Sequence, residues 1–193
     1  AQQRIDDHWY QGTADAIYQN IYSIHSENPE QVLILAGDHV YKMNYKSMLD
    51  FHRERKADLT IGVVPVPVGE AHDVGVIQVD ENNTVIGFQE KPKTAKTIPG
   101  DPKRVYGSMG IYIFDRYALE EELNEDAKKE TAHDFGKNII PQLIQGGNRN
   151  IVAYQFVDMN KKEALYWRDV GTLEDAAFAL DAVAPAALRP ALL

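Results

Sequence analysis

The chain has 193 residues, of which 44% are hydrophobic and 25% are charged, as in an ordinary folded domain. Acidic residues outnumber basic ones by 29 to 20, which argues against a nucleic-acid-binding or membrane-binding surface. The absence of cysteine excludes a disulfide framework, a thiolate metal site and a cysteine nucleophile. No apolar run approaches the ~20 residues that span a bilayer, and the first residues show no signal-peptide pattern, so we expect a cytoplasmic protein.

Helices and strands are predicted to alternate through the first half of the chain. Apolar residues recur at helical spacing over 13–27, with Thr13 as the candidate N-cap. A continuous apolar run over 32–36 predicts a buried strand. A second helix is predicted over 45–56, followed by a strand over 59–66.

The second half continues this alternation. Two strands over 74–79 and 84–90 predict a hairpin, and proline and glycine over 92–104 predict a loop. The remaining predicted elements are strands over 108–114 and 151–157, helices over 116–124, 134–146 (interrupted at Pro141) and 173–183, and a tail over 184–193. The whole pattern favours one α/β domain, with a mixed sheet flanked by helices on both faces.

Two aspartates are candidate metal ligands. Asp38 lies just beyond the carboxyl end of the 32–36 strand, where ligands bind in open α/β sheets, and its carboxylate suits Mg²⁺. Asp169 precedes a glycine turn, and aspartates distant in sequence can meet at one metal. The alternatives are that Asp38 only caps the following turn and that Asp169 only pairs with Arg168.

Three further segments could contact a phosphate or a nucleotide. Lys91, stiffened by the proline after it, could reach a phosphate as a point charge, unless it is a solvated surface lysine. The turn at Gly12 and Thr13 opens a helix whose amide groups suit a base edge or a phosphate, unless it is an ordinary capped helix. Because His133 and Asp134 are adjacent, their side chains should point apart, and we interpret Asp134 as an N-cap.

In their order and spacing, these segments resemble bacterial glucose-1-phosphate adenylyltransferase, also called ADP-glucose pyrophosphorylase. The resemblance runs from Ala1 to about Val183, and the last two of its motifs point to the ADP-glucose branch rather than to enzymes that use UTP or dTTP. Its motifs are W-Y-Q-G-T-A-D-A from Trp9, L-A-G-D-H-V-Y-K-M-N-Y from Leu35, F-Q-E-K-P from Phe88, G-S-M-G-I-Y-I-F-D from Gly107, H-D-F-G-K from His133 and Y-W-R-D-V-G-T-L-E from Tyr166.

The resemblance implies a Rossmann-like nucleotidyltransferase fold and a reaction. In that reaction AMP passes from ATP to glucose 1-phosphate, giving ADP-glucose and pyrophosphate for glycogen or starch synthesis. By the same resemblance, Asp38 and Asp169 would hold Mg²⁺ on the nucleotide phosphates, and Lys91 would contact the sugar phosphate. The other implied substrate-side residues are Glu90, Ser108, Asp134, Phe135 and Trp167, and the implied nucleotide-side residues are Tyr10, Gly12 and Thr13.

The sequence also departs from the family pattern. Members begin with a strand and a G-G-x-G-x-R-L loop that cradles the triphosphate, and they end in a β-helix domain, neither of which we find. We therefore expect 1–183 to form a partial, Rossmann-like catalytic domain with a linker over 184–193, and the isolated chain to be weakly active or inactive. The alternative is a non-catalytic module that binds sugar phosphate or serves in assembly. Because the 32–36 strand would lose a neighbour, we expect a homo-oligomer that buries its edge.

Overall fold

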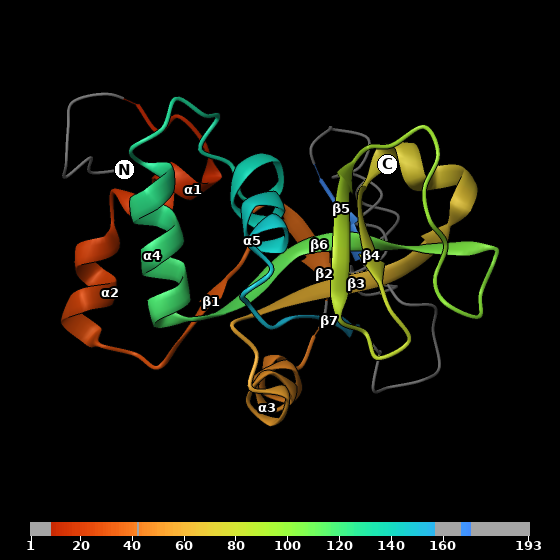
Figure 1. The fold of residues 1–193 in the computed structure, drawn as a ribbon, viewed down its shortest axis with the longest axis horizontal. Coiled ribbons are helices and arrows are strands. Elements are labelled where there is room, and N and C mark those ends of the chain that lie inside the picture. Colours follow the sequence, from red (N-terminus) through yellow and green to blue (C-terminus); the bar gives the residue numbers. More distant parts are fainter. Residues whose placement is uncertain (1–8, 42, 157–166, 171–193) are drawn as a thin grey trace, which may run out of the picture.

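A six-stranded mixed sheet forms the centre of the molecule (Figure 1). The computed structural model describes residues 9–41, 43–156 and 167–170. The strands of this sheet are β1 (Gln31–Ile34), β3 (Leu59–Pro67), β4 (Gly75–Val79), β5 (Val85–Glu90), β6 (Arg104–Asp115) and β7 (Ile151–Gln155). Their order is β5-β4-β6-β3-β7, with β1 also paired to β6, and β3 and β7 are the parallel pair. The predicted mixed α/β fold is confirmed.

The long strand β6 organises the sheet. One of its edges pairs with β3 along most of its length. Its other edge is shared, because β4 pairs near Tyr106 and Gly107 whereas β1 pairs from Tyr112 to Asp115. The sheet therefore splits between β4 and β1, as the two sides of Figure 1 show. Ser108 lies at this split, on a strand that begins four residues earlier than the 108–114 prediction.

Helices cover both faces of the sheet, as predicted. They are α1 (Thr13–Tyr18), α2 (Ile21–Glu27), α3 (Tyr45–Arg55), α4 (Arg116–Asp126) and α5 (Ile140–Gly146), with a 3₁₀ helix η1 (Val68–Asp73) and a π-helix η2 (Phe135–Ile139). Figure 1 shows α1, α4 and α5 on one side of the sheet and α3 on the other. Along β6, Phe114 packs with α4 and α5, while Ile111 and Ile113 pack with Met48 of α3.

The single helix predicted over 13–27 is wrong, because α1 and α2 are separate. The Asn20 side chain donates to the Ala16 carbonyl (2.8 Å) and to the Tyr10 hydroxyl (3.1 Å) at the break. Such local side-chain bonds compete with the helical ladder and favour a break. The N-cap of α1 is Gly12, with no side-chain cap bond, so the cap predicted at Thr13 is also wrong.

The interruption predicted in the 134–146 helix is confirmed. Here η2 gives way to α5 at Ile140, and Pro141 lies in the first turn of α5, where its missing N–H is not needed. Asp134 is the N-cap of η2, as interpreted from sequence, and its Oδ1 accepts from the Lys137 amide at 2.9 Å.

Two very short strands form a separate ribbon that the sequence did not predict. β2 (His39–Tyr41) pairs antiparallel with β8 (Trp167–Asp169). Strands of three residues show no readable periodicity, and this pair joins segments far apart in sequence. The predicted helix over 173–183 and the tail over 184–193 lie outside the described residues.

One edge of the sheet is open within the described residues, where β1 pairs only with β6. Leu33 and Leu35 are 40% and 43% exposed there. This agrees with the expected exposed edge, and oligomerisation stays a prediction. No helix in the described part is long and apolar enough to cross a membrane.

Candidate functional site

A cavity of about 510 Å³ opens where the sheet splits between β1 and β4. Its walls come from α1, the turn after β1, the end of β5, the middle of β6, the start of η2 and β8. It brings together most of the predicted site residues, namely Thr13, Asp38, Glu90, Lys91, Ser108, Asp134, Phe135 and Trp167. Tyr10 and Gly12 are not among its described lining residues.

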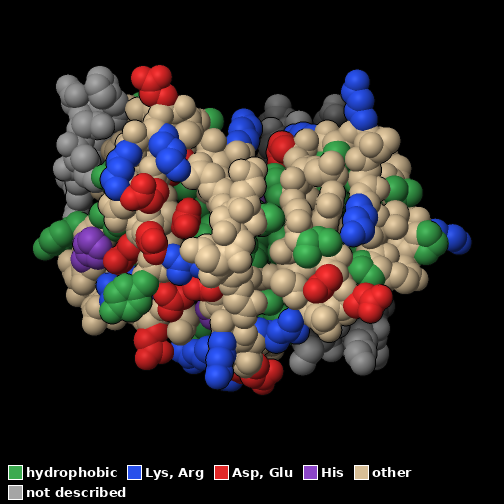
Figure 2. Space-filling model, viewed as in Figure 1, with side chains coloured by type: hydrophobic (Ala, Val, Ile, Leu, Met, Phe, Trp, Pro, Cys, Tyr) green, Lys and Arg blue, Asp and Glu red, His purple; other side chains and the backbone are tan. Residues whose placement is uncertain are grey.

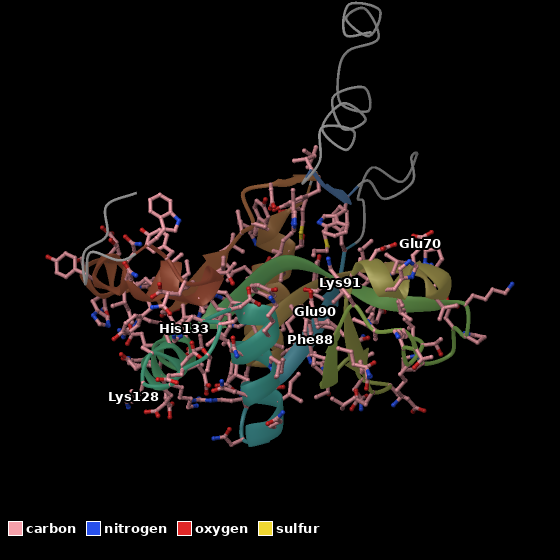
Figure 3. All side chains as sticks on the ribbon, turned by 90° about the horizontal axis from the view of Figure 1, so that it is seen from above. Glu70, Phe88, Glu90, Lys91, Lys128 and His133 are labelled. Carbon is pink, nitrogen blue, oxygen red and sulfur yellow. The ribbon has the colours of Figure 1, made fainter. Side chains whose placement is uncertain are left out.

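Glu90 and Lys91 lie side by side at the end of β5, close to Phe88 (Figure 3). Lys91 has a φ of 43°, a left-handed conformation uncommon outside glycine, and its amide donates to the Val74 carbonyl at 3.2 Å. Such backbone conformations persist where surrounding structure fixes them, often at functional sites. The Lys91 side chain therefore leaves β5 in a direction fixed by its backbone.

Two glycines lie close to the Glu90 carboxylate, and the packing is tight at Gly75. A Cβ at Gly75 would lie 3.1 Å from Glu90 Oε2 and 2.9 Å from Phe88 Cζ. A Cβ at Gly136 would lie 3.8 Å from the same Glu90 oxygen. Strand β4 and helix η2 therefore approach Glu90 from two sides.

The Asp38 side chain is 64% exposed and borders the cavity. Residues 38 and 169 come together through the β2–β8 ribbon, since His39 pairs with Asp169 and the Val170 amide donates to the Asp38 carbonyl at 2.8 Å. The Asp169 side chain is outside the described atoms. Among the described side chains, no group of three or more His, Asp or Glu forms a ready metal site.

Tyr112 is a site residue that sequence reasoning missed. Burial, together with nearby Asp134 and Glu90, raises its pKa to about 12, and a hydrogen bond with Ser108 opposes the rise. The hydroxyl is therefore protonated at neutral pH. Since Ser108 and Tyr112 are four residues apart on one strand, the two-residue side-chain period could have grouped them.

His39, the first residue of β2, was also missed. Its Nε2 is 3.6 Å from Asp38 Oδ1, and its ring meets the Trp167 ring edge-on, with centroids 5.2 Å apart. Gly110, with a φ of 66°, leaves room for it, because a Cβ there would lie 3.0 Å from His39 Cε1. His39 Nδ1 and Trp167 Nε1 are buried and have no hydrogen-bond partner in the described part of the chain.

Two amides at the start of α1 are already paired within the protein, which favours the alternative of an ordinary helix start. The amides of Ala14 and Asp15 donate to the His133 carbonyl at 2.7 and 3.2 Å. Gly12 packs so closely that a Cβ would lie 2.2 Å from the Ala132 carbonyl oxygen. The helix N-terminus is thus satisfied by backbone within the protein, and the glycine at position 12 has a packing role.

Phe135 and His133 belong to the support of the cavity. Phe135 is 2% exposed, with its ring centroid 5.6 Å from that of Tyr112 and 5.8 Å from that of Phe114. His133 Nδ1 lies 2.7 Å from Asp126 Oδ2, so His133 and Asp134 do not form a catalytic pair. Figure 3 shows His133 well apart from Glu90 and Lys91.

Carboxylates outnumber cationic side chains in the described lining of the cavity. Its described lining includes the carboxylates of Asp38, Asp73, Glu90 and Asp134, with Lys91 as its lysine. On the outer surface, Figure 2 shows basic side chains interspersed with acidic ones. A phosphate would therefore meet repulsion that a hard divalent cation on carboxylate oxygens could offset.

The amino-acid sequence matches a known protein family over nearly its whole length. Residues 1–184 match the family model described as nucleotidyl transferase, and the chain belongs to that family. Among curated proteins, it is 54% identical over 174 residues to the glucose-1-phosphate adenylyltransferase of Rhodopirellula baltica. It is 50% identical to the proteins of the same name from Koribacter versatilis, over 187 residues, and Photobacterium profundum, over 178 residues.

These matches cover nearly all of this chain but less than half of each relative. The three alignments cover 90%, 94% and 90% of this chain. They cover 39%, 44% and 44% of the relatives. The chain thus spans about two fifths of the length of the curated relatives it matches, and the resemblance seen in its motifs is confirmed over that span.

Proposed function

We propose that this chain carries the sugar-phosphate side of a glucose-1-phosphate adenylyltransferase site. In the reaction, AMP is transferred from ATP to glucose 1-phosphate, giving ADP-glucose and pyrophosphate. The observation that carries the proposal is the cavity in which Lys91, Glu90 and Ser108 border the same space as Asp38. The names of the most similar relatives support the choice of substrates.

The chemistry requires no general base. An oxygen of the glucose 1-phosphate phosphate forms a bond to the α-phosphorus of ATP, and the bond from that phosphorus to pyrophosphate breaks. The attacking oxygen is already anionic, so catalysis consists of positioning and charge stabilisation. This fits a cavity whose described titratable groups are mainly carboxylates and one lysine.

Each named residue then has a role. Lys91 holds the sugar phosphate as a point charge, and Glu90 and Ser108 contact sugar hydroxyls. Thr13 borders the nucleotide side of the cavity, and Trp167 borders its sugar side.

Asp38 and Asp169 are the proposed Mg²⁺ ligands. The β2–β8 pairing, which brings residues 38 and 169 together, and the exposed carboxylate of Asp38 suit an oxygen-ligated cation. When bound, Mg²⁺ neutralises negative charge on the nucleotide phosphates. A cation held there would offset the repulsion between the carboxylates of the cavity and a phosphate.

The test is calorimetric titration with glucose 1-phosphate in the presence of Mg²⁺. Lys91→Ala should weaken binding by about tenfold or more, as expected for loss of a charged hydrogen-bond donor. Lys93→Ala removes an exposed lysine two residues away that does not line the cavity, and should leave affinity unchanged. Equal effects of the two substitutions, or no binding by the wild-type chain, would contradict the assignment.

A second assay measures pyrophosphate released from ATP and glucose 1-phosphate. We expect negligible turnover by this chain alone, since it contains no G-G-x-G-x-R-L loop to supply backbone donors to the triphosphate. Loss of one such donor already lowers rates by about 10²–10³-fold. Turnover at ordinary enzyme rates of roughly 1–10³ s⁻¹ would refute this expectation.

A non-catalytic assembly module remains the second candidate, and the open edge of β1 favours it. Beside that edge is a groove of about 380 Å³ lined by Leu33, Tyr45 and Leu49 among others. Exposed edges and apolar grooves are typical of association surfaces. We propose that the chain forms a homo-oligomer through this surface, whichever activity it has.

A further inference from the structure

The Thr13 hydroxyl joins two walls of the cavity that are far apart in sequence. It donates to Asp134 Oδ2 at 3.0 Å and accepts from the Phe135 amide at 3.1 Å. A threonine hydroxyl has one donor and two acceptor positions, so its donor is fully used in this contact. The first residue of α1 is thereby fastened to the turn that begins η2.

The backbone is closely packed around this contact between Thr13 and the turn before η2. The Ala14 amide donates to the His133 carbonyl at 2.7 Å, and Gly12 is pressed against the Ala132 carbonyl. Thr13 is therefore held from both sides, and its hydroxyl meets Asp134 in a fixed geometry.

The turn that Thr13 holds leads directly to Glu90. Asp134 uses its other oxygen, Oδ1, to cap η2 through the Lys137 amide at 2.9 Å. Gly136, in the same turn, has its Cβ position 3.4 Å from Phe88 Cζ and 3.8 Å from Glu90 Oε2. Figure 3 shows Phe88, Glu90 and Lys91 grouped together on the facing strand. Any movement of this turn thus changes the space around Glu90.

We propose that Thr13 is a positioning residue for the sugar-phosphate pocket, acting through Asp134 and Gly136 on the space around Glu90. The inference rests on the proposed function and deepens it. Each Asp134 oxygen accepts a hydrogen bond from within the protein, so Asp134 holds this turn to α1 and to η2. Removing the Thr13 hydroxyl takes a donor from Asp134 and leaves the Phe135 amide without its acceptor. A misplacement of about 1 Å in an active site can lower the reaction rate by about 10²-fold.

The chain contains a closely matched control for this hydroxyl. Thr131 Oγ1 donates to Asp126 Oδ1 at 2.9 Å and accepts from the His133 amide at 3.0 Å. It therefore makes the same two kinds of bond as Thr13, with a further contact to His133 Nδ1 at 3.3 Å, but does not line the cavity. Replacing either threonine by valine removes a hydroxyl that bonds both an aspartate and a backbone amide. The shape of the side chain is kept.

The experiment compares glucose 1-phosphate affinity, with Mg²⁺ present, in wild type, Thr13→Val, Thr13→Ser and Thr131→Val. We expect Thr13→Val to weaken binding about tenfold, which is about 1.4 kcal/mol, because a displaced turn disturbs the space around Glu90, and we expect Thr13→Ser to restore binding. Both valine variants should lower the melting temperature, but Thr131→Val should leave affinity unchanged. Equal losses of affinity in the two valine variants, or none in Thr13→Val, would reduce Thr13 to a purely structural residue and overturn the proposal.

A measurement without ligand separates this inference from the proposed function. Hydrogen exchange of the Phe135 amide should accelerate at least about tenfold in Thr13→Val, because its acceptor is lost, and stay as in wild type in Thr131→Val. If exchange of the Phe135 amide is unchanged in Thr13→Val, the Thr13 hydroxyl does not hold this turn, and the inference is overturned. Accelerated exchange in a protein whose wild type binds no glucose 1-phosphate would instead refute the proposed function, and with it the effect of Thr13 on that ligand.

Discussion

His52 is a buried titratable side chain whose environment makes a prediction about stability. It is 2% exposed on α3, and its Nδ1 lies 2.8 Å from the Thr60 hydroxyl of β3. Burial lowers its pKa below the ordinary 6.5, outweighing the opposing effect of nearby Asp115 and Asp58. The folded protein therefore prefers the neutral ring, whereas the unfolded chain binds a proton as the pH falls through 6.5.

The free energy of unfolding should therefore decrease as the pH falls from 6.5 to the lowered pKa of folded His52. The slope contributed by one such group is at most about 1.4 kcal/mol per pH unit. Urea unfolding of wild type and His52→Gln between pH 7.5 and about 5 measures it, and the variant should have the shallower slope. His72→Gln is the control, because the His72 side chain is 64% exposed. A slope unchanged in His52→Gln would show that His52 is not the group responsible.

At the scale of elements, a buried carboxylate connects the end of α4 with the loop before η2. Asp126 is 2% exposed and accepts from both His133 and Thr131. Asp126→Ala should destabilise the protein by about 3–5 kcal/mol, the usual cost of breaking a buried pair. Glu125→Ala next to it removes a surface contact with Lys128 and should change stability little. Thermal melting of both variants is the measurement, and similar melting temperatures would contradict the structural role of Asp126.

How far each element could be predicted depends on how local its cause is. The apolar runs that became β3, β4 and β7, and the cap at Asp134, are encoded within a few residues, and the sequence located them closely. The ribbon of β2 and β8 depends on pairing His39 with Asp169, and no local pattern reveals such a contact. The break at Asn20 depends on a bond to Tyr10, ten residues away. Local patterns therefore identified the main sheet, and long-range contacts determined the corrections.

The candidate site also contains residues that the sequence identified and residues that only long-range contacts position. The resemblance to a known family, and not periodicity, assigned Glu90, Lys91 and Ser108 to one pocket. Tyr112 could have been grouped with Ser108 from strand period alone. The joint between Thr13 and Asp134 spans 121 residues and could only be seen in the folded molecule.

For the molecule as a whole, the open edge of β1 predicts self-association. Val32 and Ile34 pack into the core, whereas Leu33 and Leu35 are 40% and 43% exposed beside a strand with β6 as its partner in the described residues. Unpaired strand edges without charge or proline are templates for another strand, and exposed apolar side chains add to the driving force. A second copy of this chain has the same open edge, so a two-fold symmetric dimer pairs the β1 edges of both copies.

Sedimentation velocity at micromolar concentration should therefore detect a dimer or a higher assembly. Leu33→Lys places a charge on the edge and should shift the equilibrium to monomer, because a lysine would be buried unpaired in the paired edge. Ile86→Lys is the control, since Ile86 is 47% exposed on β5, at the other side of the sheet. A wild-type chain that sediments as a monomer would show that the exposed leucines and the free edge of β1 are tolerated in solution. Equal dissociation by both lysine variants would place the interface elsewhere.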